Sequence, residues 1–254
     1  MVHKRYKDGL LLYRSDILNI PHAMFARHGG CSPPPYDSLN CSYGVGDDFT
    51  LVKKNRNRIR KTLGIKEIKA VTQVHGDAIL VIDGMHQKTH SPEYDALITD
   101  RPGIGLLIQQ ADCQAILLHD PVQNVIAAIH SGWRGSVGNI IGKTIVRMQQ
   151  IFSVQARDIL AVISPSLGPC CAEFINYKRE LPLHFRAFRP ANKKDHFDFW
   201  AISKKQLILA GVDKKNIDTV GLCTACKQNF FSHRRAVRQG NGQTGRNCSI
   251  IALP

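Results

Sequence analysis

The sequence lacks the long apolar runs that a membrane protein needs. Not one run approaches the roughly 20 apolar residues of a membrane helix. The first residues, MVHKRYKDGLLLYRSD, contain only the short patch LLLY, whereas a signal peptide has about 7 to 15 apolar residues. We therefore expect a globular protein that has no membrane partner and is located in the cytoplasm.

Internal repeats, low-complexity tracts and convincing linkers are also missing from the 254 residues. With 43% apolar residues, the chain can bury an ordinary hydrophobic core. We therefore expect one domain over residues 1–254.

Acidic residues are scarce relative to basic ones. The 20 Asp and Glu residues face 34 Lys and Arg residues, which gives a net charge of +14. This excess favours an anionic partner such as a phosphate ester, a nucleotide or a nucleic acid, although a solvated basic surface is the simpler interpretation. Aromatic residues make up only 7% and form no stacking motif, so a specific nucleic-acid partner is not expected.

Eight cysteines are present, and without an export signal we expect them to stay reduced. Cys223 and Cys226 form a C-x-x-C unit that, with Cys170 and Cys171, could hold structural zinc or act as a redox dithiol. Vicinal cysteines chelate one metal poorly, and the chain has no second C-x-x-C unit. Coincidence is therefore the simpler interpretation, and the sequence does not define the role of these four residues.

Short apolar segments separated by tight turns occupy the middle of the chain, which predicts mainly antiparallel sheets and not a doubly wound one. We expect residues 68–74 to pair with residues 78–82, and residues 94–99 with residues 104–109. Helices are predicted over residues 50–63 and 138–152 from the spacing of their apolar residues. The basic residues of the first helix are expected on a solvated face.

A long irregular loop covers residues 28–48, HGGCSPPPYDSLNCSYGVGDD. Loops of this length in compact domains are usually functional or disordered. Because Tyr36, Leu39 and Tyr43 can anchor it in the core, we expect an ordered lid or site wall.

A hairpin is predicted for residues 114–119 and 124–129, because Asp120-Pro121 between them is a turn signal. Cys113 precedes the first strand and His130 follows the second, so both lie at the same end. A thiol beside an imidazole suits nucleophilic catalysis, and Asp112 could orient a histidine. The following segment, Ser131 to Gly135, is a small-residue bend that presents Arg134.

His75 lies at a predicted turn and can join this pair. Two imidazoles and one thiolate leave one coordination position open, as a catalytic zinc ion requires. The separations along the chain match no local metal motif, so spacing alone leaves the nucleophile and the metal site as alternatives. Arginines 234, 235, 238 and 246 lie among glycines and could clamp phosphate, or could be solvated.

A family resemblance rests on the strings QVHGD, YDALIT, ADC, HSGWRG, GGCSPPPYDSLN, GDD, NRNRI, CT followed by FFSHRR, and TGR. In this order they resemble the YfiH-like family, formerly described as multicopper polyphenol oxidoreductases or laccases and now regarded as purine nucleoside phosphorylases. The resemblance runs over residues 25–251. Ser131 and His233 depart from the family's usual alanine and tyrosine, which bears on substrate preference more than on chemistry.

The resemblance implies an α+β fold, a single-domain α/β/β/α sandwich with mainly antiparallel or mixed sheets, similar to the cysteine hydrolases of the cytotoxic necrotizing factor type. It also implies a zinc ion held by His75, Cys113 and His130, with copper a weaker alternative. Arg27 and Asn40 fall on family positions. The activities implied are phosphorolysis of adenosine, inosine, guanosine and methylthioadenosine, and deamination of adenosine.

We therefore expect a zinc-dependent purine nucleoside phosphorylase whose partners are a nucleoside and phosphate. The expected catalytic residues are His75, Cys113, His130 and Asp112, and the expected substrate- or phosphate-binding residues are Arg27, Asn40, Arg134, Arg234 and Arg235. Asp112 and His28 are candidate proton donors to the base. The nucleoside preferred and the oligomeric state do not follow from the sequence.

Three alternatives remain. The first is a hydrolase or amidase with Cys113 as nucleophile and His130 as base. The second is a copper polyphenol oxidase, which is disfavoured because the chain lacks the H-x-H pairs expected of several copper centres. The third is a basic nucleic-acid-binding protein, which rests on net charge alone.

Overall fold

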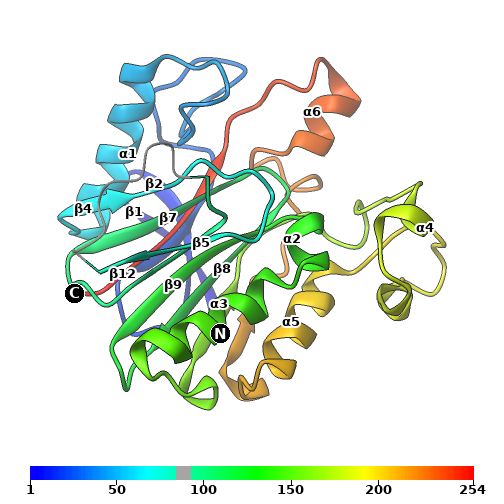
Figure 1. Cartoon of the computed structure of the whole chain (residues 1–254). Coiled ribbons are helices and arrows are strands. Elements are labelled where there is room, and N and C mark those ends of the chain that lie inside the picture. The colour runs from blue at the N-terminus through cyan, green and yellow to red at the C-terminus, as the bar shows by residue number, and fades with distance from the viewer. Residues whose placement is uncertain (84–92) are drawn as a thin grey trace.

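The computed structural model describes residues 1–83 and 93–254. In this part of the chain the strands form two six-stranded sheets that lie face to face (Figure 1). The first has the order β1-β2-β3-β12-β7-β4 and contains β1 (Val2–Lys7), β2 (Leu10–Ser15), β3 (His22–Phe25), β4 (Glu67–Lys69), β7 (Ile104–Gln110) and β12 (Asn247–Ala252). The second has the order β11-β10-β8-β9-β6-β5 and contains β5 (Ile79–Ile82), β6 (Ala96–Thr99), β8 (Gln114–Asp120), β9 (Val125–Ser131), β10 (Leu160–Ile163) and β11 (Ile217–Thr219).

Helices cover the outer faces of both sheets (Figure 1). The α-helices are α1 (Phe49–Leu63), α2 (Trp133–Val137), α3 (Ile140–Phe152), α4 (Tyr177–Glu180), α5 (Phe199–Leu209) and α6 (His233–Gln239), and short 3-10 helices span Ala156–Asp158, Leu183–Phe188 and Lys214–Asn216. None of the helices in residues 1–83 and 93–254 is long and apolar enough to cross a lipid bilayer.

Alternate residues of each central strand enter different cores. In β8, Leu117 packs between the two sheets, whereas Ile116 packs with Ile141 of α3. On the first sheet, Ile250 of β12 packs with Ile59 of α1. Strands buried on both faces have continuous apolar runs and not an alternating pattern, and each buried Leu or Ile contributes about 1.5–3 kcal/mol. The predicted α+β fold with α/β/β/α layers is confirmed.

Helix α1 confirms the predicted helix and has clear signals at both ends. The Asp48 side chain accepts a hydrogen bond from the Leu51 N–H at 3.0 Å, which caps the first turn. Gly64 ends the helix with φ of 68°, in the left-handed region where glycine has no steric penalty. Helix α3 covers Ile140–Phe152, within the predicted range.

Strand pairing is mainly antiparallel, as predicted, and the parallel pairs are β4 with β7, β5 with β6, and β10 with β11. The two early pairs expected from local turns are wrong. Strands β4 and β5 lie in different sheets, and so do β6 and β7. The chain crosses from one sheet to the other at both turns, and apolar alternation indicates an extended segment without indicating its partner.

The β8–β9 hairpin is confirmed, with Ala115 opposite His130 in antiparallel register. Between β7 and β8 the chain crosses from the first sheet to the second through residues 111–113. Residues 70–78 make a similar crossing between β4 and β5. The two crossings and the end of β9 come together at one end of the sandwich.

Candidate functional site

The three predicted ligands lie on these converging segments. His75 lies in the crossing between β4 and β5, Cys113 directly before β8, and His130 near the end of β9. Their donor atoms all lie within 4.8 Å of one another. The structure thus brings together three residues that are far apart along the chain.

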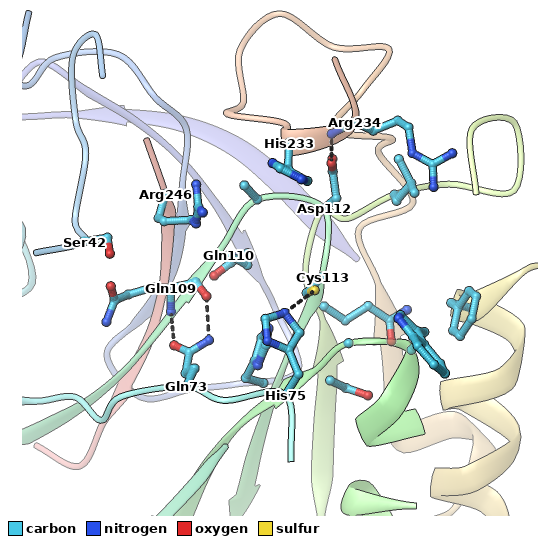
Figure 2. Close-up of a pocket in the computed structure, with 18 of the residues that line it drawn as sticks. Ser42, Gln73, His75, Gln109, Gln110, Asp112, Cys113, His233, Arg234 and Arg246 are labelled. Atoms are coloured by element: carbon cyan, nitrogen blue, oxygen red, sulfur yellow. Dashed lines mark hydrogen bonds between the residues drawn. The ribbon is translucent and has the colours of Figure 1, made fainter. Parts of the chain in front are cut away.

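His75 and Cys113 face each other at the base of a pocket (Figure 2), with 3.8 Å between His75 Nε2 and Cys113 Sγ. The rings of His75 and His130 are nearly perpendicular, at 80°, with 4.8 Å between their centroids. His75 is exposed to the pocket, Cys113 is half-buried and His130 is buried. The cluster is therefore open to a ligand on one side.

Asp95, directly before β6, positions both histidines. Its Oδ1 accepts hydrogen bonds from His130 Nδ1 at 2.7 Å and from the His75 N–H at 3.0 Å, and its Oδ2 accepts from the Gly76 N–H at 2.7 Å. Because a carboxylate accepts only, His130 carries its proton on Nδ1 and directs Nε2 to the cluster.

Asp95 is 0% exposed, and burial would raise its pKa. The hydrogen bonds from His130 and the backbone outweigh burial and lower that pKa. The carboxylate therefore stays charged beside His130. In the sequence its only signals were its place in the YDALIT string and its position directly before the mostly apolar segment Ala96–Thr99.

Cys113 and His130 shift each other's pKa. Burial would raise the pKa of the Cys113 thiol, but His130 and His75 outweigh it and lower the pKa to about 6. Burial would lower the pKa of His130, but Cys113 and Asp95 raise it to about 9. At neutral pH the pair is therefore a thiolate beside an imidazolium in the protein without bound metal.

The donor set fits a transition metal ion. Two imidazole nitrogens and one thiolate are ligands that zinc and copper prefer, whereas magnesium and calcium prefer oxygen. Gly132 makes room for this set, because a Cβ atom there would lie 3.0 Å from His75 Cδ2 and 3.2 Å from Cys113 Sγ. An open fourth position toward the pocket is the arrangement of a catalytic zinc site.

The pocket above the cluster has a volume of about 900 Å³, which is within the usual range for small-molecule sites. Part of the long loop predicted as a site wall, residues 42–45, lines one side. Aromatic side chains line another side, and polar groups lie between them. The lining residues used below are Ser42, Tyr43, Arg56, Gln110, Gln114, Trp133, Glu173, Phe174, His233, Arg234 and Arg246.

Asp112 lines this pocket, but its carboxylate serves the α6 segment. Its Oδ1 accepts a hydrogen bond from Thr224 Oγ1 at 2.6 Å. Its Oδ2 accepts one from the Arg234 N–H, also at 2.6 Å (Figure 2). The backbone of Asp112 has φ of 86°, which turns this side chain away from Cys113. The orienting partner of the histidine is therefore Asp95 and not the adjacent Asp112.

Arg27 and Asn40 fix the long loop. Arg27 donates from Nε to the Asp37 carbonyl at 2.6 Å and from Nη2 to Asp37 Oδ1 at 2.7 Å, and its guanidinium lies over the Phe231 ring. Buried Asn40 accepts a hydrogen bond from the Arg246 N–H at 2.9 Å through Oδ1. Neither belongs to the pocket lining as the described residues define it.

Arg134 and Arg235 also lie outside this lining. Arg134 is exposed and stacks over the Trp133 ring, 5.0 Å from its centroid. Arg235 is 9% exposed, and its guanidinium donates to the carbonyls of Thr224, at 2.7 Å, and Phe230. Arg235 therefore holds the preceding loop, and the expected anion-binding role does not match its position. His28, the other candidate proton donor, is exposed and faces Asn229.

The arginines that do line the pocket are Arg56, Arg234 and Arg246. Arg56 donates to the Cys41 carbonyl at 2.8 Å and lies over the Tyr43 ring. Its role was missed because α1 was read as a solvated basic helix. Arg246, at the end of the TGR string, lines the same pocket as Ser42 and His233, and the three are drawn above His75 in the view of Figure 2.

A glutamine side chain connects two of the chain segments that form the base of the pocket. The Gln73 amide pairs with the backbone of Gln109, donating at 2.7 Å and accepting at 2.8 Å (Figure 2). This clamp joins the His75 segment to β7. Deeper in, Gln110 Oε1 and Gln114 Nε2 are buried without a hydrogen-bond partner among the described residues. Such groups are costly unless a ligand or water pairs with them.

Comparison with known proteins gives consistent matches over most of the chain. The family model described as multi-copper polyphenol oxidoreductase laccase matches residues 21–254. A relative named purine nucleoside phosphorylase from Deinococcus radiodurans is 34% identical over 97% of this chain and 94% of its own length. Another of that name from Bacteroides thetaiotaomicron is 31% identical over 87% of this chain and 88% of its own length.

Solved structures agree with these matches. The crystal structure of the Bacillus licheniformis hypothetical protein YfiH has a TM-score of 0.87 at 28% identity, and covers 99% of both chains. The crystal structure of YlmD from Geobacillus stearothermophilus has a TM-score of 0.87 at 29% identity, and covers 98% of this chain and 97% of its own.

Proposed function

The chain belongs to the multi-copper polyphenol oxidoreductase family of YfiH-type proteins, and on that premise we propose that it is a zinc-dependent purine nucleoside phosphorylase. The single observation that carries this proposal is the His75, Cys113 and His130 cluster at the base of a pocket large enough for a nucleoside and phosphate. The relatives named purine nucleoside phosphorylase support a nucleoside-processing enzyme.

In phosphorolysis a phosphate oxygen forms a bond to C1′ of the ribose as the bond from C1′ to the base breaks. The products are ribose 1-phosphate and the free base, which takes up a proton. Positive charge develops on the ribose and negative charge on the base, so the site must hold an anion and supply a proton. A bound zinc ion supplies a positive charge and Lewis acidity at the base of the pocket.

We assign phosphate binding to Arg246 and Arg56. Both guanidinium groups line the pocket, and backbone contacts fix them: Arg246 Nη1 donates to the Thr244 carbonyl at 2.8 Å, and Arg56 Nε donates to the Cys41 carbonyl at 2.8 Å. Arginines fixed in this way bind phosphate oxygens with little loss of side-chain entropy. Arg234 is less suited, because its guanidinium donates to the Glu173 carbonyl and lies 3.8 Å from the Glu173 carboxylate.

We assign the nucleoside base to the opposite wall. Trp133 and Phe174 form an edge-to-face pair, with 6.3 Å between centroids, and both line the pocket. Aromatic faces stack on purines. Gln110 and Gln114 also line the pocket, and amide side chains pair with the edges of purine bases, but their unpaired atoms are buried, so a base would reach them only after these side chains turn toward the pocket.

The proton that the leaving base takes up is assigned to His233. Its imidazole lines the pocket and can both accept and donate a proton. Asp112 is not suited to this step, because both of its carboxylate oxygens already accept hydrogen bonds. Deamination of adenosine to inosine is the second activity proposed for the same pocket, and it requires water to add at C6 of the base, with the amino group leaving as ammonia, instead of attack at C1′.

One observation favours a second function. The pKa of Cys113, lowered to about 6 beside His130, is what a thiolate nucleophile requires. In that case the chain would be a Cys-His hydrolase that needs no metal. Zinc content and alkylation separate the two, because a metal-bound thiolate resists alkylation, whereas a nucleophile is trapped by an amide-directed electrophile.

The direct test follows adenosine with and without phosphate, measuring adenine and inosine by chromatography. Adenine that forms only with phosphate supports phosphorolysis, and inosine that forms without phosphate supports deamination. Cys113→Ala should abolish turnover. The matched control is Cys31→Ala, which changes an exposed cysteine outside the described pocket lining and should retain activity. Unchanged turnover in Cys113→Ala would remove the proposal.

A further inference from the structure

A second cysteine cluster lies on two loops that leave neighbouring strands. Strands β10 and β11 are parallel, with Ala161 opposite Ile217, so the segments that follow them start side by side. The first segment carries Cys170 and Cys171, and the second carries Cys223 and Cys226. A bridge between Ser166 and Cys223 keeps the segments paired. The sheet itself therefore brings the four cysteines together.

The separations between the sulfur atoms match a shared metal ion. All four Sγ atoms lie within 4.8 Å of one another, and Cys226 Sγ is 3.5 Å from Cys171 Sγ and 3.6 Å from Cys170 Sγ. Four sulfurs at about 2.3 Å from a tetrahedral zinc ion are about 3.8 Å apart. A disulfide needs about 2.05 Å between two sulfurs, and pairing would leave the remaining sulfurs without a role.

Adjacent cysteines usually chelate one metal ion poorly, but the local backbone here allows Cys170 and Cys171 to do so. The N–H groups of Cys171 and Ala172 donate to the Gly168 carbonyl at 2.9 and 3.0 Å, which forms a tight turn. This turn brings the side chains of Cys170 and Cys171 to the same sulfur atom of Cys226. In the other loop the Lys227 N–H donates to the Cys223 carbonyl at 3.0 Å, so the C-x-x-C unit also forms a turn.

The surroundings suit a negatively charged metal cluster. Four thiolates around a divalent cation leave two negative charges, which need compensation. The buried guanidinium of Arg235 lies beside the segment that carries Cys223 and Cys226 and supplies a positive charge there. Arg235 also binds the loop between them through the carbonyls of Thr224 and Ala225. Arg235 can therefore compensate part of the negative charge of the four thiolates and hold the loop that carries two of them.

We propose that Cys170, Cys171, Cys223 and Cys226 hold a structural zinc ion, separate from the pocket cluster. Four protein ligands close the coordination sphere, as in structural sites, whereas the pocket cluster leaves one position open. The ion ties together two loops that carry parts of the pocket: Glu173 and Phe174 follow the first cysteine pair, and Thr224, which holds Asp112, lies within the second.

The test uses the full chain with the pocket ligands removed, so that only the proposed site can bind zinc. The double variant His75→Ala/Cys113→Ala is purified under reducing conditions, its zinc content is measured by mass spectrometry, and its coordination by zinc K-edge absorption. We expect one zinc ion per chain with a shell of sulfur atoms alone at about 2.3 Å. This readout is independent of activity, so it does not depend on the proposed function.

The complementary variant is Cys223→Ala/Cys226→Ala, which should lose one zinc ion per chain and keep a mixed nitrogen and sulfur shell. Cys31→Ala is the matched control and should keep the wild-type content. A double variant His75→Ala/Cys113→Ala without zinc, or with nitrogen or oxygen in the shell, overturns the proposal. So does a disulfide of Cys226 in protein prepared without oxygen. If Cys223→Ala/Cys226→Ala does not fold, the pocket variant alone decides.

Discussion

Nδ1 of His130 donates a hydrogen bond of 2.7 Å to the Asp95 carboxylate, which is fully buried. The same carboxylate binds the backbone of the His75 segment. One side chain therefore sets the ring orientation of one histidine and the position of the other. The following predictions examine this dependence and the other parts of the site.

Asp95→Asn should lower zinc affinity by about 10- to 100-fold, the usual effect of losing a group that orients a metal-ligating histidine. The amide is uncharged and can also donate, so it no longer selects the Nδ1-protonated ring. Competition with a chelator of known affinity measures the change. Asp77→Asn is the control, because Asp77 is half-exposed and pairs with Lys143. The zinc affinity of this variant should equal that of the wild-type protein. Equal affinities in the two variants would contradict the role of Asp95.

Alkylation of Cys113 by iodoacetamide in the metal-free protein should follow a midpoint near pH 6, since His130 and His75 lower the pKa of the thiol to about 6. The thiol of a free cysteine has a pKa of about 8.5. Loading with zinc should slow alkylation across the whole range. A midpoint near that of free cysteine would show that the imidazoles do not stabilise the thiolate.

The directions of the pKa shifts of Cys113 and His130 define the pH range in which this ion pair stabilises the metal-free protein. The pKa of Cys113 is lowered, so its contribution is lost as pH falls through about 6. The pKa of His130 is raised, so its contribution is lost as pH rises through about 9. Thermal unfolding of the metal-free protein should therefore show a loss of stability on both sides of this window, and His130→Ala should remove it.

Arg246→Gln should raise the KM for phosphate more than the KM for the nucleoside. Loss of a charge-assisted hydrogen bond costs about 1.5–3 kcal/mol, which corresponds to roughly a 10- to 100-fold lower kcat/KM for phosphate. Arg134→Gln is the matched control, because that guanidinium stacks over Trp133 outside the described lining. The assignment fails if the two variants have the same phosphate dependence.

Gly132→Ala should weaken zinc retention by displacing two ligands. The new Cβ would lie 3.0 Å from His75 Cδ2 and 3.2 Å from Cys113 Sγ, closer than ordinary packing permits. Gly44→Ala provides the comparison, since a Cβ there meets only Ser42 Oγ, at 3.9 Å, within 4 Å. Zinc content after dialysis should fall in the first variant and not in the second. Full retention in Gly132→Ala would mean that the ligands adapt.

Local signals predicted the parts of the site that are local. The Asp120-Pro121 turn was enough to place Cys113 and His130 at the same end of a hairpin. His75 was different, because it lies within a crossing between the sheets: its residue type allowed it to join the pair, but only the family resemblance favoured the metal site over the alternatives. The periodicity of apolar residues does not indicate where the chain crosses from one sheet to the other, which is why the partners of β4 and β6 were predicted wrongly.

Polar contacts between residues that are far apart in the sequence were the least predictable part of the site. Asp95 was overlooked because a buried carboxylate has no signature apart from its partners, which lie at the ends of other strands. Arg56 has the spacing of a solvated helical residue, and only its neighbour Tyr43 directs it to the pocket. The four cysteines seemed coincidental because their proximity results from the parallel pairing of β10 and β11.

The two crossings between the sheets link the chemistry to the interior of the protein. His75 and Cys113 are on connections that span both layers, whereas His130 belongs to the second layer alone. The apolar layer containing Leu106, Leu117 and Ala128 lies between the two sheets that these connections join. A change in side-chain volume in that layer should therefore shift the three donor atoms relative to one another.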